Sequence, residues 1–364
     1  MTTSHPTVSA AGAVWLVAER EVASKLRSKA FVISTSILLL IALAGVLIGG
    51  FAGPSADERS VAVTPETASV IADMPGVSSV EVADRPAAEE LVREGDVDAA
   101  LVTGGDAVFP YTVIAFDSAS TTLLLQLAQL PPVELLQTQT TDPMLRMFVA
   151  LGFGLVFLMA ASTFGATMAQ SVVEEKQTRV VELLLSAISP RQLLAGKVLG
   201  NTILAMSQIL ALAAIAVVGL TVTGQTLTLQ GLGGAIAWFA VFFLFGFVLL
   251  AALYAAAAAM VSRMEDIGST TMPLMMLVMA PYFLVIFFND NPTVLTILSY
   301  VPFSAPVGMP MRLFVGEALW WEPLLSLVIL MVSCLAAIAV GAKIYENSLL
   351  RMGARVRLIE ALRG

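Results

Sequence analysis

Residues 232–260 read LGGAIAWFAVFFLFGFVLLAALYAAAAAM, an apolar run without a single charged side chain. A helix needs about 20 mainly apolar residues to cross the hydrocarbon core of a bilayer. This run therefore predicts a membrane-spanning helix that is long enough to tilt. Other stretches meet the same criterion, and Pro273 and Pro281 predict a kink in the fifth of the six. The further stretches are residues 31–51, 148–168, 198–222, 267–288 and 324–342.

The composition indicates that lipid is the solvent for most of the chain. Of 364 residues, 58% are hydrophobic and 13% are charged, and the mean hydropathy is +0.88. A soluble domain carries about 25% charged residues. We therefore predict an α-helical polytopic membrane protein with six transmembrane helices. A net charge of -8 gives no basis for nucleic-acid binding, and the single cysteine, Cys334, excludes a disulfide framework or a cysteine metal site. No catalytic residue, metal site or cofactor is expected on this chain.

Lysine and arginine are distributed unevenly among the segments between the apolar stretches. With six spans, alternate segments lie on opposite sides of the membrane, and the segments on one side hold only Arg59, Arg85, Arg93, Arg146 and Arg312. Because positive charge is retained on the cytoplasmic side, the set of segments richer in Lys and Arg is expected to be cytoplasmic, and both termini belong to it. The chain is therefore predicted to be a multi-pass protein of the cell membrane. A cleaved signal peptide is disfavoured for residues 31–51, because that run exceeds the roughly 7–15 residues of a signal core. The richer set comprises Arg20, Lys25, Arg27, Lys29, Lys176, Arg179, Arg191, Lys197, Arg263, Lys343, Arg351, Arg355, Arg357 and Arg363.

Residues 52–145 differ sharply in composition from the rest and predict a small α/β domain on the extracytoplasmic side. Short β-branched runs flanked by Gly, Pro and Asp indicate strands. A helix is expected over 86–93, ending at Gly95, and a second one over 121–139, which Pro131 and Pro132 interrupt. The carboxylates favour a solvated acidic face, with cation or partner binding as the alternative. The expected strands are residues 60–63, 79–82, 99–102 and 112–116.

The rest of the chain divides into a cytoplasmic N-terminus, a transmembrane domain and a cytoplasmic tail. Residues 1–30 form the cytoplasmic N-terminus, in which residues 14–30 can place Trp15, Leu16, Val22 and Leu26 on one face of a helix. This pattern indicates an amphipathic interfacial helix, and an ordinary basic flank of the first span is the alternative. Residues 146–345 form a five-helix transmembrane domain, and residues 346–364 form a cytoplasmic tail.

Residues 173–197, VEEKQTRVVELLLSAISPRQLLAGK, form a longer connector than two helices need. The pattern predicts a helix over 174–185 and a second helix that begins after Ser189 as N-cap, with Pro190 at its first position. Three leucines, 183–185, form an apolar knob between charged residues. A knob of this kind suits a groove on a soluble partner.

The same segment resembles the coupling element of type-2 ABC exporter permeases, in the branch with an outward-facing insert that includes sodium-efflux permeases. Two further stretches agree: residues 262–266, and residues 300–306 followed by Met311 and Arg312. The match covers nearly the whole chain and is weakest in the acidic insert. The matching positions of the coupling element are Glu175, Lys176, Arg179, Glu182, Leu184, Leu185, Ser186, Ser189, Pro190, Leu194, Gly196 and Lys197.

The resemblance implies a permease subunit without its own ATP site, working with a separate ABC ATPase subunit and with a second, identical or different permease. Sodium or another small solute would be the cargo. The residues expected to contact the ATPase subunit are Glu175, Lys176, Arg179, Glu182, Leu183, Leu184, Leu185, Ser189, Pro190 and Lys197.

Two other classes remain as alternatives. The pair Gly196-Lys197 lacks the upstream glycine of a phosphate-binding loop, so it does not indicate an ATP site. If the chain works without an ATPase subunit, it is a secondary transporter or a membrane sensor with an extracytoplasmic ligand-binding domain. Secondary transporters usually carry an ionisable residue within the bilayer, and the inner parts of the predicted spans offer only neutral polar groups. These groups serve helix packing or line a translocation path: Thr163, Thr167, Asn201, Thr202, Ser207 and Gln208.

Overall fold

The chain is described as a computed structural model, and it falls into two compact units. One comprises Met1–Gly50 and Gln139–Gly364, and the other comprises Phe51–Thr138. The structure describes residues 9–51, 59–72, 74, 77–104, 111–116, 127, 143–178, 180–224, 226–349 and 357–363.

Within these described ranges, six helices are long and apolar enough to cross a membrane, as the sequence predicts. Each of these helices covers all or nearly all of its predicted apolar stretch. The second, third and sixth extend well beyond it, because helical hydrogen bonding continues into their polar ends. The six are α2 (Lys29–Phe51), α6 (Pro143–Gln177), α8 (Pro190–Val222), α9 (Thr226–Ala259), α10 (Ile267–Phe287) and α13 (Glu322–Leu349).

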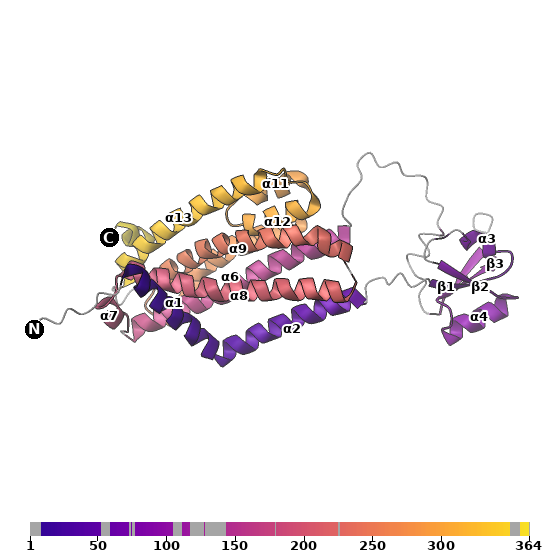
Figure 1. The fold of residues 1–364 in the computed structure, drawn as a ribbon, viewed down its shortest axis with the longest axis horizontal. Helices are drawn as coiled ribbons and strands as arrows, with labels where there is room; N and C mark the ends of the chain where they lie inside the picture. Colours follow the sequence, from indigo (N-terminus) through magenta and orange to yellow (C-terminus); the bar gives the residue numbers. More distant parts are fainter. Residues whose placement is uncertain are drawn as a thin grey trace, which may run out of the picture. The chain divides into compact units, whose positions relative to one another are not determined.

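Shorter helices complete this unit. Figure 1 shows the long helices running side by side, with α1 and α7 at one end of the bundle and α11 and α12 at the other. We call these the α7 end and the α12 end. The shorter elements are α1 (Ala10–Arg27), α7 (Val180–Leu185), the 3-10 helix η1 (Met264–Asp266), α11 (Pro292–Tyr300), α12 (Ala305–Val315) and α14 (Leu358–Arg363).

Helix α9 lies at the centre of the bundle and packs against α6, α8, α10, α12 and α13. A ladder of phenylalanine pairs joins it to α6, with ring centroids 4.8 Å apart for Phe153 and Phe239 and 5.7 Å apart for Phe164 and Phe247. Its last turns are alanines 255–259, all buried, and small side chains of this kind let neighbouring helices approach closely. The core of the unit is therefore centred on α9.

Helix α2 is an exception to this packing. None of the residues in its apolar span is buried inside the protein. It approaches α8 at Gly219, where an added Cβ would lie 2.4 Å from Val46 Cγ1. It also approaches α6 where Phe31 meets Phe164, with ring centroids 5.8 Å apart. The apolar span of α2 thus contains no buried residue, although Phe31 packs against the main core while partly exposed.

The second unit is built on a four-stranded sheet with strand order β2-β1-β3-β4. Strands β1, β2 and β3 are parallel, and β4 pairs antiparallel with β3. Val61 and Leu101 belong to a small core on one face with Ile71 of α3, while Ala62 and Ala100 belong to the other face with Val92 of α4. The elements are β1 (Arg59–Val63), α3 (Ala68–Ile71), β2 (Val77–Glu81), α4 (Arg85–Glu94), β3 (Ala99–Thr103) and β4 (Tyr111–Ile114).

All four strands that the sequence predicts are present, each shifted by two residues or fewer at either end. Helix α4 begins after Asp84, whose side chain accepts a hydrogen bond from the Ala87 amide, and ends at Gly95 with φ 81°. The insert between the first two spans is therefore α/β in the part that the structure describes. The helix predicted over 121–139 lies outside the described residues, apart from Leu127.

Candidate functional site

The predicted coupling segment lies at the α7 end, but its first helix is interrupted. The sequence predicts one helix over 174–185, whereas α6 ends at Gln177 and α7 begins at Val180. The Thr178 hydroxyl donates to the Glu174 carbonyl at 2.8 Å, and the Gln177 amide donates to the Ser262 carbonyl at 3.2 Å. These side-chain bonds compete with continued helical bonding. Arg179, which stands at the break, lies outside the described residues.

The three leucines of the predicted knob differ in their surroundings. Leu183 is 74% exposed, and Glu182 beside it is exposed as well. Leu184 and Leu185 are half-buried and pack against the main core, next to the buried Val181. A single leucine therefore projects from α7, and the other two attach the helix to the bundle.

The start of α8 matches the sequence prediction at Ser189 and Pro190. The Ser189 hydroxyl accepts from the Gln192 amide at 3.3 Å, and the Gln192 side chain accepts from the Ser189 amide at 2.8 Å. This reciprocal arrangement is a capping box. Arg191 follows and forms an exposed ion pair of 3.0 Å with Glu346 of α13. The first turn of α8 is thus fixed to its own cap and to the last span.

Two lysines that the sequence assigns to partner contact, Lys176 and Lys197, are instead fully buried. The Lys176 ammonium donates to the carbonyls of Ala259 and Ser348 at 2.8 and 2.9 Å, near the ends of α9 and α13. A cation is favoured there because helix C-termini carry unsatisfied carbonyls and partial negative charge. In this state Lys176 joins three helices and offers no surface to a partner.

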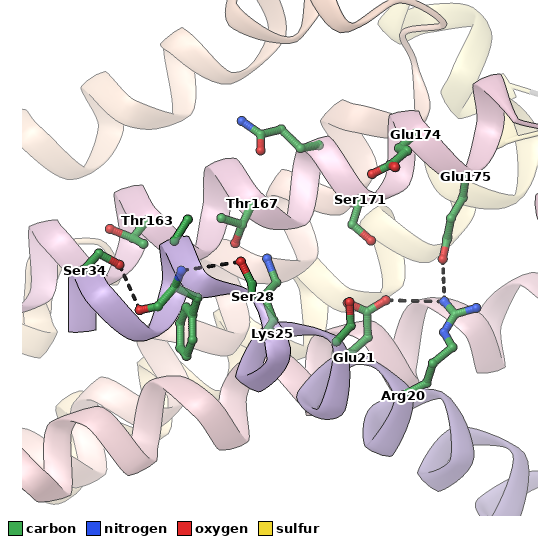
Figure 2. A pocket seen from close by; sticks show the side chains of 14 residues that line it. Arg20, Glu21, Lys25, Ser28, Ser34, Thr163, Thr167, Ser171, Glu174 and Glu175 are labelled. Carbon is green, nitrogen blue, oxygen red and sulfur yellow. Dashed lines mark hydrogen bonds and ion pairs between the residues drawn. The ribbon is translucent and has the colours of Figure 1, made fainter. Parts of the chain in front are cut away.

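Lys197 forms the centre of a buried ionic network. Its ammonium lies 2.8 Å from a Glu21 carboxylate oxygen and 3.0 Å from a Glu175 oxygen, and it donates to the Ser171 hydroxyl at 2.7 Å. Arg20 pairs with Glu175 and with Glu21 (Figure 2). We call Arg20, Glu21, Glu175 and Lys197 the charged cluster. It contains two cations and two anions, and it ties α1 to α6 and α8.

Electrostatics within the cluster favour the ionised form of Glu21. Burial alone would raise the pKa of its carboxyl group, but the charge and hydrogen bond of Lys197, with smaller contributions from Arg20 and Lys25, outweigh burial and lower that pKa. Glu21 is therefore a carboxylate. Removal of Lys197 would leave this charge with one partner, the half-exposed Arg20 at 3.4 Å.

Close backbone approach brings α1 onto α8. An added Cβ at Gly196 would lie 2.4 Å from Val17 Cβ, and one at Gly200 would lie 2.8 Å from the Ala18 carbonyl oxygen. The buried face of α1 consists of small residues and Glu21. The sequence pattern singles out a different face, from which Trp15, Leu16 and Leu26 remain more than half exposed. The signal for the α8 contact was Gly-x-x-x-Gly spacing, which permits helices to pack tightly.

A polar cavity of about 620 Å³ opens beside the charged cluster, between α1, α2 and α6. Of the residues predicted to form a translocation path, Thr163 and Thr167 line it. Asn201, Thr202 and Ser207 do not line it, and each bonds a carbonyl four residues earlier in α8; Gln208 does not line it either. The full lining is Arg20, Glu21, Ser24, Lys25, Ser28, Ala30, Phe31, Ser34, Thr163, Thr167, Gln170, Ser171, Glu174 and Glu175.

The α12 end holds a buried ion pair that sequence reasoning did not identify. Arg312 of α12 lies 2.9 and 3.1 Å from the two carboxylate oxygens of Glu322, at the start of α13. Tyr300 donates to the same carboxylate at 3.0 Å, and Arg312 donates to the Ser299 hydroxyl at 3.1 Å. The signal was an arginine in an apolar stretch, ten residues before a glutamate. This group fixes α11 and α12 against the last span.

No group of three or more His, Cys, Asp and Glu side chains that could hold a metal ion lies among the described residues. The polar groups found instead are paired charges at the two ends of an apolar bundle. A model of a family described as ABC-2 family transporter protein matches residues 29–343. The chain belongs to this family.

Two relatives extend the comparison. The Bacillus subtilis (strain 168) protein named "Uncharacterized protein YhaP" is 25% identical over 399 aligned positions, which cover 93% of this chain and 95% of that protein. The Methanocaldococcus jannaschii protein named "Uncharacterized protein MJ1024" is 27% identical over 212 positions, which cover 57% of this chain and 51% of that protein. No solved structure matches. The ABC-2 membership makes the chain a multi-pass membrane component of a transporter, and permeases of this family typically work with an ATPase subunit.

Proposed function

We propose that this chain is the membrane-spanning permease subunit of an exporter driven by ATP hydrolysis on a separate subunit. Two permeases, identical or different, would assemble with two ATPase subunits. The α7 end would face the cytoplasm, because Lys and Arg are concentrated in the segments that meet there. At the opposite end of the bundle, Arg146 and Arg312 are both buried. The cargo that the resemblance favours is sodium or another small solute.

The observation that carries this proposal is the exposed Leu183 on α7, at a helix break between two spans. An apolar side chain that is 74% exposed beside the charged Glu182 suits a pocket on a soluble subunit. An apolar groove of about 470 Å³ lies nearby, lined by residues of α1 and the first turns of α8, including Trp15, Arg191 and Leu199. Together they would form the surface on which the ATPase subunit docks.

Force applied at α7 would reach the spans through specific contacts. Leu184 and Leu185 pack on the main core, and the Arg191–Glu346 pair joins α8 to α13. The charged cluster joins α8 and α6 to α1. A push on α7 would therefore move α6, α8 and α13 together and switch the bundle between inward- and outward-facing arrangements. Lys176 and Lys197 would help to transmit this movement from inside the bundle rather than contact the ATPase subunit.

The test purifies the tagged chain from its native membrane and measures the ATPase subunit that accompanies it. Leu183→Ala should reduce the retained ATPase subunit about tenfold, because truncating a central apolar contact costs about 1–2 kcal/mol or more. The matched control is Leu358→Ala, since Leu358 is 54% exposed on α14 outside the proposed docking surface. Both variants should reach the membrane in equal amounts.

Two results would contradict the proposal. One is equal retention of the ATPase subunit by the Leu183 and Leu358 variants. The other is transport by the purified chain alone in sealed vesicles, driven by an ion gradient without ATP, which would assign it to the secondary transporters.

A further inference from the structure

Helix α14 packs on the side of the bundle at the α7 end. Its Ala361 is fully buried and belongs to a small core with Ala256 of α9 and Ile344 of α13, and the Asn347 side chain donates to the Ala361 carbonyl at 2.8 Å. Ala256 lies three residues before the end of α9, and Ile344 lies five residues before the end of α13. Helix α14 is therefore held beside the last turns of these spans rather than beyond them.

The other faces of α14 carry exposed apolar side chains. Ile359 lies about 160° around the helix axis from Ala361, at about 100° per residue, and is 65% exposed. Leu358 beside it is more than half exposed as well. Water is an unfavourable surrounding for apolar surface of this kind. Two adjacent apolar side chains are thus left uncovered by the part of the chain that the structure describes.

Arginines accompany these apolar residues. Arg363 follows Ile359 by one helical turn and shares its face, and Arg357 directly precedes the helix. Both arginines are exposed, and neither forms an ion pair with a residue that the structure describes. Residues 350–364 hold four arginines and one glutamate, Glu360, whereas the whole chain has a net charge of -8. Positive charge is therefore concentrated around α14.

The depth of α14 follows from its contact with α13, which ends at the α7 end of the bundle (Figure 1). Val340 is the last exposed apolar residue of α13. Lys343, which is exposed, is the first charged residue of this helix after Glu322, and Ile344, which contacts α14, is next in the chain. Because charged side chains flank the hydrocarbon core, Lys343 marks the region of the lipid head groups. Helix α14 therefore lies at head-group depth.

This combination of depth, apolar surface and positive charge fits a bilayer that contains anionic lipid. At head-group depth, exposed apolar side chains enter the boundary between head groups and acyl chains. Each basic residue near the surface adds attraction to anionic lipids. A soluble partner would have to displace lipid that already occupies this depth.

We propose that α14 is a membrane-surface helix, which binds anionic lipid of the leaflet at the α7 end. Two apolar and two cationic side chains form the lipid contact: Leu358, Ile359, Arg357 and Arg363. This contact lies outside the surface proposed for the ATPase subunit, and it does not depend on what the chain transports.

The test places a fluorescent label on α14 of the full chain and measures its quenching in lipid vesicles. Ile359→Cys is labelled in a Cys334→Ala background, because Cys334 is the single native cysteine. The vesicles consist of phosphatidylcholine with a lipid that carries a nitroxide near its head group, and are prepared with and without phosphatidylglycerol. The lipid nitroxide should quench the label more strongly than aqueous iodide does, and phosphatidylglycerol should increase the quenching by lipid.

The charge contribution is measured by replacing both arginines. Arg357→Gln combined with Arg363→Gln should lower the ratio of lipid-bound to water-exposed label at least about fivefold in vesicles with phosphatidylglycerol, because each basic residue adds attraction to the anionic surface. The matched control is Arg263→Gln, since Arg263 is exposed at the same end but lies outside α14. Thermal unfolding of each variant checks that the fold is intact.

A second label separates this proposal from the proposed function. Leu183→Cys, on the exposed residue of α7, should be quenched by iodide rather than by the lipid nitroxide, and its result bears only on the docking surface. At position 359, stronger quenching by iodide than by lipid would overturn the lipid proposal in favour of a soluble partner. Equal lipid quenching with and without phosphatidylglycerol, or an equal loss in Arg263→Gln, would also overturn it.

Discussion

Replacing Lys197 with methionine would test whether the charged cluster holds the bundle together. Methionine keeps most of the side-chain volume but leaves Glu21, which is 5% exposed, without its contact at 2.8 Å. Removal of one partner of a buried pair costs about 3–5 kcal/mol. Glu175 and Glu21 would keep Arg20, which is half-exposed, so we expect the lower end of this range, about 3 kcal/mol.

The assay is reversible unfolding by sodium dodecyl sulfate in mixed micelles, followed by tryptophan fluorescence. A double-mutant cycle with Glu21→Gln isolates the pair, and the double variant should be more stable than Lys197→Met alone by about 2 kcal/mol, because no uncompensated carboxylate remains at position 21. Arg191→Gln is the control, since its pair with Glu346 is exposed and worth about 0.5 kcal/mol. A cost for Lys197→Met equal to that control, or simple additivity in the cycle, would refute the reasoning.

Three further changes probe the packing and charge of the bundle. Gly200→Ala should separate α1 from α8 at a cost of about 1–3 kcal/mol, seen as faster proteolysis within α1, while Gly233→Ala, where an added Cβ meets nothing within 4 Å, should not. Arg312→Met should leave the Glu322 carboxylate uncompensated, cost about 3–5 kcal/mol, and speed amide hydrogen exchange in α11 and α12; unchanged exchange would count against the pair. The pKa of Glu21 is lowered in the folded state. Its contribution to stability is therefore complete above the usual glutamate pKa of about 4.3 and is lost as pH falls through the lower pKa of the folded state. The unfolding midpoint should depend less on pH in this acidic range for Glu21→Gln than for the wild type.

Much of the fold was predictable because the deciding signals are local. The apolar runs predict six spans, since hydrocarbon thickness alone sets the length a helix needs. In the insert, β-branched runs between turn residues predict the strands. The cap at Ser189 and Pro190 was equally readable, because a capping box depends on a few adjacent residues.

The candidate site was less predictable because its contacts join residues far apart in the chain. The resemblance to a coupling element placed Lys176 and Lys197 on a partner surface, but both are fully buried, which lysines almost never are unless paired. Their partners are helix-end carbonyls and the carboxylates of Glu21 and Glu175, and no local pattern indicates these distances. The contact between α1 and α8 was not predicted for a related reason. The sequence pattern assigned Trp15, Leu16 and Leu26 to the membrane interface, and these residues are exposed, whereas α8 presents Gly196 and Gly200, which accept only small neighbours.

The sparse packing of α2 connects bilayer thickness to the charged cluster. At about 1.5 Å per residue its 23 residues extend about 35 Å, longer than a hydrocarbon core of about 30 Å. Because little protein packs against α2, its inclination can adjust to the hydrophobic thickness of the bilayer, and a thinner membrane favours a larger tilt. Ser28 alone separates α2 from α1, whose Glu21 is held by Lys197. Mechanical tension in the surrounding lipid therefore has a short covalent route to the ionic contacts that fasten α1.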